Sequence, residues 1–158
     1  MIIEYRPIGI VHSPFTEQEG TPIQPSRAKG AKGTVEVFSE YAEALSDLDG
    51  FSHIYLLCHL HRSDGFKLKV VPYLDTVPRG LFATRAPRRP NPIGLSIVDL
   101  IAIEGNELTV ENIDLLDGTP VLDIKPFVDQ FDERREVRTG WLEQARARRD
   151  RADDRFSR

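Results

Sequence analysis

The stretch "IGLSIVDLIAIEGNELTVENIDLL", residues 93–116, constrains the fold most, because it predicts two long strands joined by a tight turn at Gly105–Asn106. Shorter β-prone segments lie at Ile8–Ser13, at Gly33–Phe38 and at Lys67–Val71, where Pro72 ends the pattern. These segments are too short and too close together for a fold built mainly of helices. The sequence therefore indicates a chain that folds mostly through strand pairing.

Two more strands and one helix complete the expected elements. Phe51–His61 is apolar for most of its length, which predicts a strand buried on both faces, and "VLDIKPF" predicts a last short strand. Ser39–Leu48 has helical spacing with Ser39 as its N-cap. The Gly-rich turn that follows the first strand of a Rossmann fold is missing. We therefore expect a mainly β protein, a small antiparallel or mixed β-barrel with few short helices.

Length and composition indicate one domain with a tail. We expect a β-barrel domain over residues 1–140 and a solvated helical or disordered tail over residues 141–158. No apolar run approaches the roughly 20 residues that span a bilayer, so we expect no membrane partner. Cys58 is the single cysteine and lies in the apolar run "IYLLCHL", which favours a buried thiol and a reducing cytoplasm.

A stiff, basic segment stands out against the net charge of -4. "GLFATRAPRRPNPIGLS" holds three arginines, Arg85, Arg88 and Arg89, among three prolines that fix the backbone. Residues 61–90 carry seven Lys and Arg against two Asp. A guanidinium binds carboxylate or phosphate through paired donors, and a rigid mounting lowers the entropy lost on binding. The segment therefore predicts an anion-binding loop rather than a solvated crossover.

A second candidate is the turn in "DLLDGTPVLDIKPF", where Asp117 and Gly118 favour a tight reversal and Pro120 stiffens its exit. Such a turn can offer the Asp117 carboxylate and free backbone amides to a ligand, or it can be an ordinary hairpin turn. Gln24 in "TPIQPSRAKG" has a donor and an acceptor that suit the edge of a base. His61 and Arg62, at a strand end, are candidates for a polar ligand contact.

The histidines do not predict a metal site. His53, His59 and His61 fall on one face of the expected strand, but His53 lies too far along it to join the other two. Cys58 points to the opposite face, and His12 is elsewhere in the sequence. We therefore expect no metal.

Four segments together resemble the TrmO/TsaA-like family. They are "FATRAPRRPNPIGLS", "DLLDGTPVLDIKP", the amino-terminal "IGIVHSPF" and "FSHIYLLCHLHR", and they cover most of the chain from Ile8 to Phe127. The resemblance implies an S-adenosylmethionine-dependent tRNA methyltransferase with a β-barrel in place of the Rossmann fold. It implies methylation of N6 on threonylcarbamoyladenosine at position 37 of tRNA, and a homodimer with the cofactor near the subunit boundary.

The resemblance also implies particular contacts. Those to the cofactor fall on Gln24, Pro25, Ser26, His61, Arg62, Arg85, Leu95, Asp117, Gly118, Thr119 and Pro120. Arg88 and Arg89 are expected to meet RNA phosphates, and no residue is assigned as a general base. The resemblance also implies that longer bacterial members carry a further carboxy-terminal domain, which we expect this chain to lack.

Two other functions fit the same residues. One is an S-adenosylmethionine-binding regulator without catalysis, and the other is a methyltransferase that acts on a different substrate. The modest overall charge favours these alternatives, because strong nucleic-acid binders tend to be basic. The basic region at residues 61–90 and the arginine-rich tail favour RNA.

Overall fold

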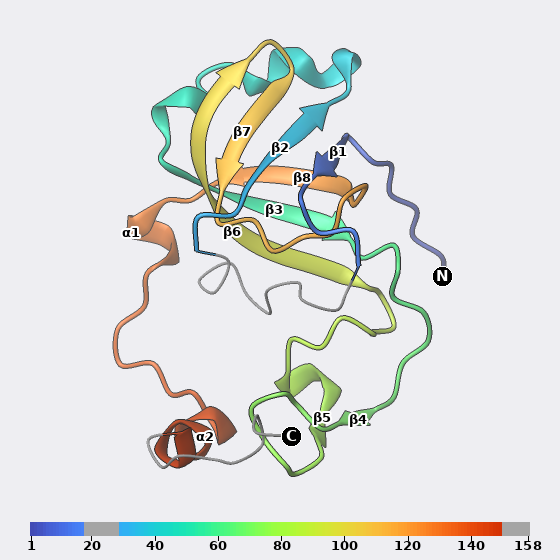
Figure 1. Cartoon of the computed structure of the whole chain (residues 1–158), viewed down its shortest axis with the longest axis vertical. Coiled ribbons are helices and arrows are strands. Elements are labelled where there is room, and N and C mark those ends of the chain that lie inside the picture. The colour runs from blue at the N-terminus through green and yellow to red at the C-terminus, as the bar shows by residue number, and fades with distance from the viewer. Residues whose placement is uncertain (18–28, 150–158) are drawn as a thin grey trace.

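The structure, a computed structural model, describes residues 1–17 and 29–149, the last four of them by backbone alone. Within these residues, six strands close into an antiparallel barrel in the order β1–β2–β7–β6–β3–β8 (Figure 1). The barrel strands are β1 (Gly9–His12), β2 (Lys32–Val37), β3 (His53–His59), β6 (Ile93–Glu104), β7 (Glu107–Glu111) and β8 (Pro120–Pro126). The predicted mainly β, non-Rossmann barrel is confirmed.

The remaining elements are short. Short 3-10 helices form η2 (Ser39–Leu45), η3 (Leu48–Gly50) and η4 (Leu81–Ala83). The helices are α1 (Asp129–Asp132) and α2 (Trp141–Arg149), and β4 (Lys69–Val70) pairs with β5 (Arg79–Gly80) in a separate two-stranded sheet. No helix in residues 1–17 and 29–149 is long and apolar enough to cross a membrane.

Alternate residues of the barrel strands fill its interior. Val35, Leu56 and Leu108 are fully buried, as are the other inward-facing members of the core, Val11, Ile54, Cys58, Val110, Ile113 and Val121. Burial of each of the larger side chains stabilises the fold by about 1.5–3 kcal/mol relative to exposure. The period of two in a strand thus turns a modest apolar content into one continuous core.

The long strand β6 closes the barrel by bending. Its first half, Ile93–Asp99, pairs with β3, and its second half, Asp99–Glu104, pairs with β7. The register shifts between Leu100 and Ala102, which leaves Ile101 as an extra residue. Such a bulge bends and twists a strand, and this lets one strand serve two sides of a small barrel. The predicted turn at Gly105–Asn106 joins β6 to β7, with Gly105 at a φ of 61°.

Three sequence predictions need correction. β3 is fully buried on one face only, because Tyr55 and Leu57 on its outer face are half-buried. The predicted Ser39–Leu48 helix forms 3-10 turns in which Phe38, not Ser39, is the N-cap residue, without a side-chain capping bond. The Lys67–Val71 strand shortens to the two residues of β4, since only Lys69 and Val70 find partners in β5.

Residues 62–92, here called the lobe, project from the barrel between β3 and β6 (Figure 1). Asp75, which is 5% exposed, receives two bonds from the Arg79 guanidinium at 2.8 and 2.7 Å. These bonds and the Thr76 amide hold the pKa of Asp75 below its usual value. Leu81 is buried beside them and donates its amide to Leu68 O at 2.9 Å. The lobe is therefore an ordered unit.

The helix α2 lies against the lobe. Trp141 donates its indole Nε1–H to Ala83 O at 2.8 Å, and the Arg79 guanidinium lies 5.7 Å from the centre of the Trp141 ring. Ala145 on the same helix is buried. The start of the segment expected to be a solvated tail thus packs on the lobe.

Candidate functional site

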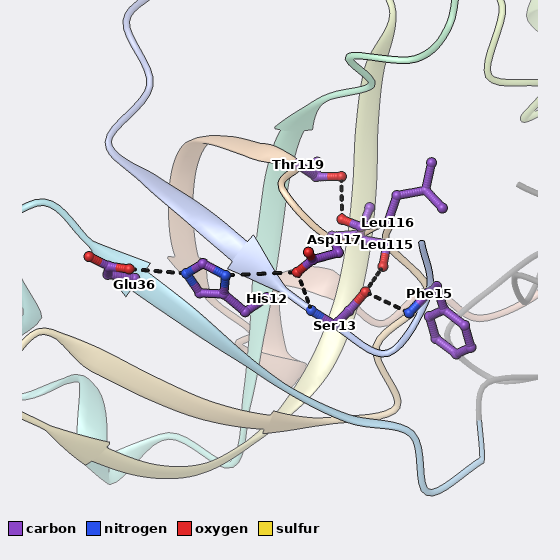
Figure 2. A network of polar contacts seen from close by, with 8 residues as sticks. All are labelled: His12, Ser13, Phe15, Glu36, Leu115, Leu116, Asp117 and Thr119. Atoms are coloured by element: carbon purple, nitrogen blue, oxygen red, sulfur yellow. Dashed lines mark hydrogen bonds and ion pairs between the residues drawn. The ribbon is translucent and has the colours of Figure 1, made fainter. Parts of the chain in front are cut away.

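The DGTP turn is tied to the end of β1 (Figure 2). Asp117 Oδ1 accepts the Ser13 amide at 3.1 Å, and Ser13 Oγ donates to Leu115 O at 2.6 Å. These bonds join residues more than 100 positions apart in the sequence. Gly118 has a φ of 79°, a conformation that glycine adopts without the strain other residues incur. The turn is therefore rigid, and its carboxylate has a fixed position.

The amides of this turn are not free, which settles a point that the sequence left open. The Asp117 amide donates to Phe15 O at 2.7 Å, the Gly118 amide to Val11 O at 2.8 Å, and the Thr119 amide to Leu116 O at 3.2 Å. Pro120 has no amide hydrogen. Val11 in β1 and Phe15 just after it accept two of these amides, so the turn offers a ligand the half-exposed Asp117 carboxylate but no amide donor from residues 117–120.

His12 belongs to the same network, although it was not among the predicted contacts. Its Nε2 lies 3.0 Å from Glu36 Oε2, and its Nδ1 lies 3.8 Å from Asp117 Oδ1 (Figure 2). Two carboxylates thus flank one imidazole at the surface. The only hint in the sequence is that His12 lies in "IGIVHSPF", since Glu36 and Asp117 become its neighbours only when the barrel closes.

A half-buried carboxylate, Asp114, links the two main motifs and was also missed. Its Oδ1 accepts a hydrogen bond from Ser96 Oγ at 2.7 Å, and Ser96 is buried in β6 at the exit of the Arg/Pro segment. Burial raises the pKa of Asp114, while the Ser96 bond and the positive charge of Arg85 oppose the rise. Asp114 therefore places a negative charge within range of Arg85.

The three arginines of the Arg/Pro segment have different environments. Arg89 is half-buried, and its Nη1 donates to Thr84 O at 2.9 Å and to Ala86 O at 3.2 Å. Its guanidinium also lies 5.7 Å from the centre of the Phe82 ring. Arg85 and Arg88 are exposed, and within the described part of the chain Arg88 has no acidic partner. Arg89 thus braces the loop that presents Arg85 and Arg88.

His61 and Arg62 lie at the same end of the barrel, just after β3. Burial lowers the pKa of His61, and the charges of Arg62 and His59 add to this effect, which favours the neutral imidazole. Arg62 Nη1 donates to Thr16 O at 2.7 Å, close to the start of the predicted 21–30 loop. The three predicted contacts in that loop, Gln24, Pro25 and Ser26, lie outside the described residues.

Leu95 differs from its neighbours in the direction of its side chain. Strand alternation places Ser96 on the inner face of β6 and Leu95 on the outer face, where it is 52% exposed. Ile93, Ile97 and Ile101 are also exposed, at 43%, 38% and 55%. Leu95 therefore lies on an exposed aliphatic strip of β6 rather than beside Asp114.

No metal-binding arrangement is found in residues 1–17 and 29–149, where no three His, Cys, Asp or Glu side chains gather as ligands. His53 instead pairs with Asp99 at 2.9 Å. Cys58 is buried, as predicted, and burial raises its pKa to about 12, with a further contribution from Asp114. At neutral pH Cys58 is therefore a thiol and not a nucleophilic thiolate.

The chain also has a cavity of about 310 Å³ at the opposite end of the barrel. Its lining includes Ile8 at the start of β1, Val37 at the end of β2 and Pro126 at the end of β8. The predicted site residues in the described part of the chain instead lie after the end of β3, before and near the start of β6, and at the turn that leads into β8. None of the predicted residues in the described part of the chain lines this cavity.

The candidate site is therefore the barrel end that carries Ser13, Arg62, Arg85, Asp114 and Asp117, where Asp117 is bonded to Ser13 and Asp114 lies within range of the charge of Arg85. It combines guanidinium groups, carboxylates and a neutral imidazole, all carried on hydrogen-bonded turns. This set suits a ligand with both an anionic and a cationic end. Among the described residues, it includes no thiolate and no cluster of metal ligands.

Comparison with known proteins shows the family to which the chain belongs. Residues 10–133 match the family described as the tRNA-methyltransferase O N-terminal domain. A protein of Pyrococcus abyssi, named a probable S-adenosyl-L-methionine-binding protein, is 56% identical over 143 residues, which cover 90% of this chain and 78% of the relative. The mouse tRNA (adenine(37)-N6)-methyltransferase is 38% identical over 133 residues, covering 80% of this chain but 31% of the mouse protein.

A solved structure has the same fold. The crystal structure of TrmO from Pseudomonas aeruginosa matches 89% of this chain with a TM-score of 0.75 and 41% sequence identity. This chain spans 62% of the length of that chain. The match to the family covers the lobe, both motifs and the barrel strands, apart from Gly9 at the start of β1. The chain therefore belongs to the tRNA-methyltransferase O N-terminal domain family.

Proposed function

We propose that this protein transfers a methyl group from S-adenosylmethionine to N6 of adenosine 37 in tRNA. The observation that carries the proposal is the family match over residues 10–133, together with relatives named as tRNA (adenine(37)-N6)-methyltransferases. The charges at the site support the proposal independently. The activity thus attaches to the barrel end that holds the Arg/Pro segment and the DGTP turn.

The residues at this end suit the chemical groups of the cofactor. We assign the cofactor carboxylate to Arg85, and the cofactor ammonium group or ribose hydroxyls to the Asp117 carboxylate, which lies on the rigid DGTP turn. His61 is neutral because its pKa is lowered, so it can share a hydrogen bond without repelling a cationic sulfur. Gln24, Pro25 and Ser26 remain predicted contacts, as do Gly118, Thr119 and Pro120.

When bound, S-adenosylmethionine supplies a methyl group on a positively charged sulfur, so the protein needs no nucleophile of its own. The described residues then have two tasks, which are to hold the cofactor through Arg85 and to bind the RNA through Arg88. Asp114 holds Arg85 in place through its charge, and Ser96 orients Asp114. Arg88 contacts an RNA phosphate, because it is exposed and has no acidic partner among the described residues. Arg89 acts as the brace of the loop.

We also propose that adenosine 37 carries a threonylcarbamoyl group when it is methylated. That group ends in a carboxylate, and the site is flanked by exposed guanidinium groups that bind carboxylates well. The support comes from the resemblance of the motifs and from this charge match. An unmodified adenosine lacks this carboxylate, so a tRNA without the threonylcarbamoyl group would bind more weakly.

We further propose that the protein is a homodimer whose subunits meet at the aliphatic strip of β6. Ile93, Leu95, Ile97 and Ile101 are exposed on one strand, and exposed apolar groups on neighbouring positions favour an interface. Because Leu95 is a predicted cofactor contact, this interface would bring the cofactor close to the boundary between subunits. A cytoplasmic location follows from a tRNA substrate and the lone buried thiol.

The test is methyl transfer followed by nucleoside mass spectrometry. The purified protein is incubated with labelled S-adenosylmethionine and with tRNA from cells that lack the activity. We expect the label on N6 at position 37 and no label in a tRNA with guanosine at that position. Label at another nucleotide would contradict the proposed target.

The same experiment separates the other functions. Several archaeal relatives are named only as S-adenosyl-L-methionine-binding proteins, which keeps a regulatory role in view. A regulator would give heat with S-adenosylmethionine in calorimetry but no transfer to any RNA. Equal transfer to tRNA with and without the threonylcarbamoyl group would contradict the proposed preference. Sedimentation of Ile97→Glu tests the dimer, and an unchanged mass would move the interface elsewhere.

A further inference from the structure

The lobe exposes aromatic side chains to an unusual degree. Phe66, Tyr73 and Phe82 are 50%, 82% and 78% exposed, and all three lie within residues 62–92. Large exposed apolar groups that gather in one segment mark a binding surface. The described contacts within the chain give Tyr73 and Phe66 no ring partner. Packing within the fold therefore does not account for the exposure of these side chains.

Basic residues alternate with these aromatics in the sequence. Lys67 and Lys69 flank Leu68, and Arg85 and Arg88 follow Phe82 within six residues. Lys67, Lys69 and Arg88 are exposed and have no acidic partner in residues 1–17 and 29–149. The lobe thus gathers unpaired positive charge in a chain whose net charge is -4. Such charge attracts a polyanion.

The composition of the lobe distinguishes it from the aliphatic strip of β6. The strip consists of Ile and Leu, which pack well against another protein surface but offer no π-face. The lobe combines rings with cations, and unpaired bases stack on rings while their phosphates pair with Lys and Arg. The two surfaces therefore suit two different partners, a second copy at β6 and a single-stranded nucleic acid at the lobe.

The lobe is also mounted rigidly. Arg79 is fixed by buried Asp75 and contacts the Trp141 ring, while Trp141 Nε1 bonds to Ala83 O at 2.8 Å. Arg89 lies over the ring of Phe82. A surface that is already ordered loses little entropy when a ligand binds. The helix α2, which supplies Trp141, lies beyond the family match at residues 10–133.

We propose that the lobe binds the unpaired loop bases that flank the target adenosine, by stacking them on Tyr73 and Phe66 while Lys67, Lys69 and Arg88 pair with the loop phosphates. This inference rests on the proposed function. The lobe ends in the Arg/Pro segment, which carries Arg85 of the candidate site. Bases held on the lobe would place adenosine 37 at that site.

The test measures binding of a fluorescent anticodon stem–loop RNA to Tyr73→Leu and Phe66→Leu at low salt. Leucine keeps the apolar surface but removes the ring. Loss of one stacked base weakens binding roughly 5-fold to 100-fold. We expect that loss for the stem–loop but not for a fully paired duplex of the same length. Tyr73→Phe, which keeps the ring, and Tyr5→Leu, an exposed tyrosine outside the lobe, should bind like the unaltered protein.

Three controls separate the ways this test can fail. Calorimetry with S-adenosylmethionine should give equal affinity for all variants, because none of the changes lies in the cofactor site. If the unaltered protein methylates the stem–loop and Tyr73→Leu binds it equally well, the inference is wrong while the proposed function stands. If the unaltered protein neither binds nor methylates the RNA, the proposed function itself fails. A smaller mass for Tyr73→Leu in sedimentation would overturn the inference in favour of a contact between copies.

Discussion

Replacing Arg89 with lysine tests whether this residue braces the Arg/Pro loop or binds RNA. Lysine keeps the positive charge but loses the planar fork that lies among the carbonyls of Thr84 and Ala86 and over the Phe82 ring. The two hydrogen bonds come from a charged but half-buried donor, so each contributes about 1 kcal/mol. The ring contact adds about 0.5 kcal/mol or slightly more. The brace is therefore worth about 2.5 kcal/mol, and because lysine keeps part of these contacts, the change costs about 2 kcal/mol.

That energy is the upper limit for the loss of binding free energy for the cofactor. If the loop must be ordered before Arg85 can bind, Arg89→Lys weakens S-adenosylmethionine binding by up to roughly 30-fold. Calorimetry measures this affinity, and the salt dependence of tRNA binding measures phosphate contacts. Arg88→Ala should lower the salt slope by about one, whereas Arg89→Lys should leave it unchanged. Unaltered S-adenosylmethionine affinity in Arg89→Lys would refute the bracing role. A salt slope that changes only in Arg89→Glu would not restore that role.

Three further predictions have defined outcomes. Asp114→Asn should raise the melting temperature at pH 7, because a carboxyl whose pKa is raised by burial destabilises the fold once it is charged. This gain in melting temperature should vanish as the pH falls below about 4, where the carboxyl is protonated in the folded and the unfolded protein. An equal gain at low pH would contradict the reasoning. Trp141→Phe should release α2 from Ala83, seen as faster amide exchange in the helix but not in β3. Cys58, with a pKa of about 12, should resist iodoacetamide at pH 8 until the protein is denatured, and rapid native labelling would argue against its burial.

Local sequence patterns predicted most of the strands correctly. β6, β7 and their turn follow from the apolar pattern and from Gly105, whose positive φ suits glycine. The strand order of the barrel does not follow from any local pattern, because β1 pairs with both β2 and β8 over long loops. The bulge at Ile101, which closes the barrel, likewise leaves no mark in the sequence.

The same division holds for the candidate site. The Arg/Pro segment and the DGTP turn were recognised from composition and stiffness, and the structure places Arg85 and Asp117 at one barrel end. The contacts of Asp114 and His12 were missed, because Ser96 and Glu36 are brought to them only by pairing between distant segments. Whether the amides of the turn are free was left open by the sequence for the same reason: Val11 and Phe15 accept two of them from across the chain.

The different roles of the three arginines also became visible only in the structure. In the sequence Arg85, Arg88 and Arg89 are equivalent cations on one stiff loop. Only the positions of the Thr84 and Ala86 carbonyls show that Arg89 supports the loop from within. A proline-rich segment thus owes its rigidity to a guanidinium as well as to its prolines.

The most direct test of the central claim is a crystal structure of the protein soaked with S-adenosylhomocysteine, the product form of the cofactor. We predict density between the DGTP turn and the Arg/Pro segment, with the carboxylate of the ligand at Arg85 and Asp117 within hydrogen-bond distance. Ordered ligand in the 310 Å³ cavity at the other end of the barrel would contradict this account.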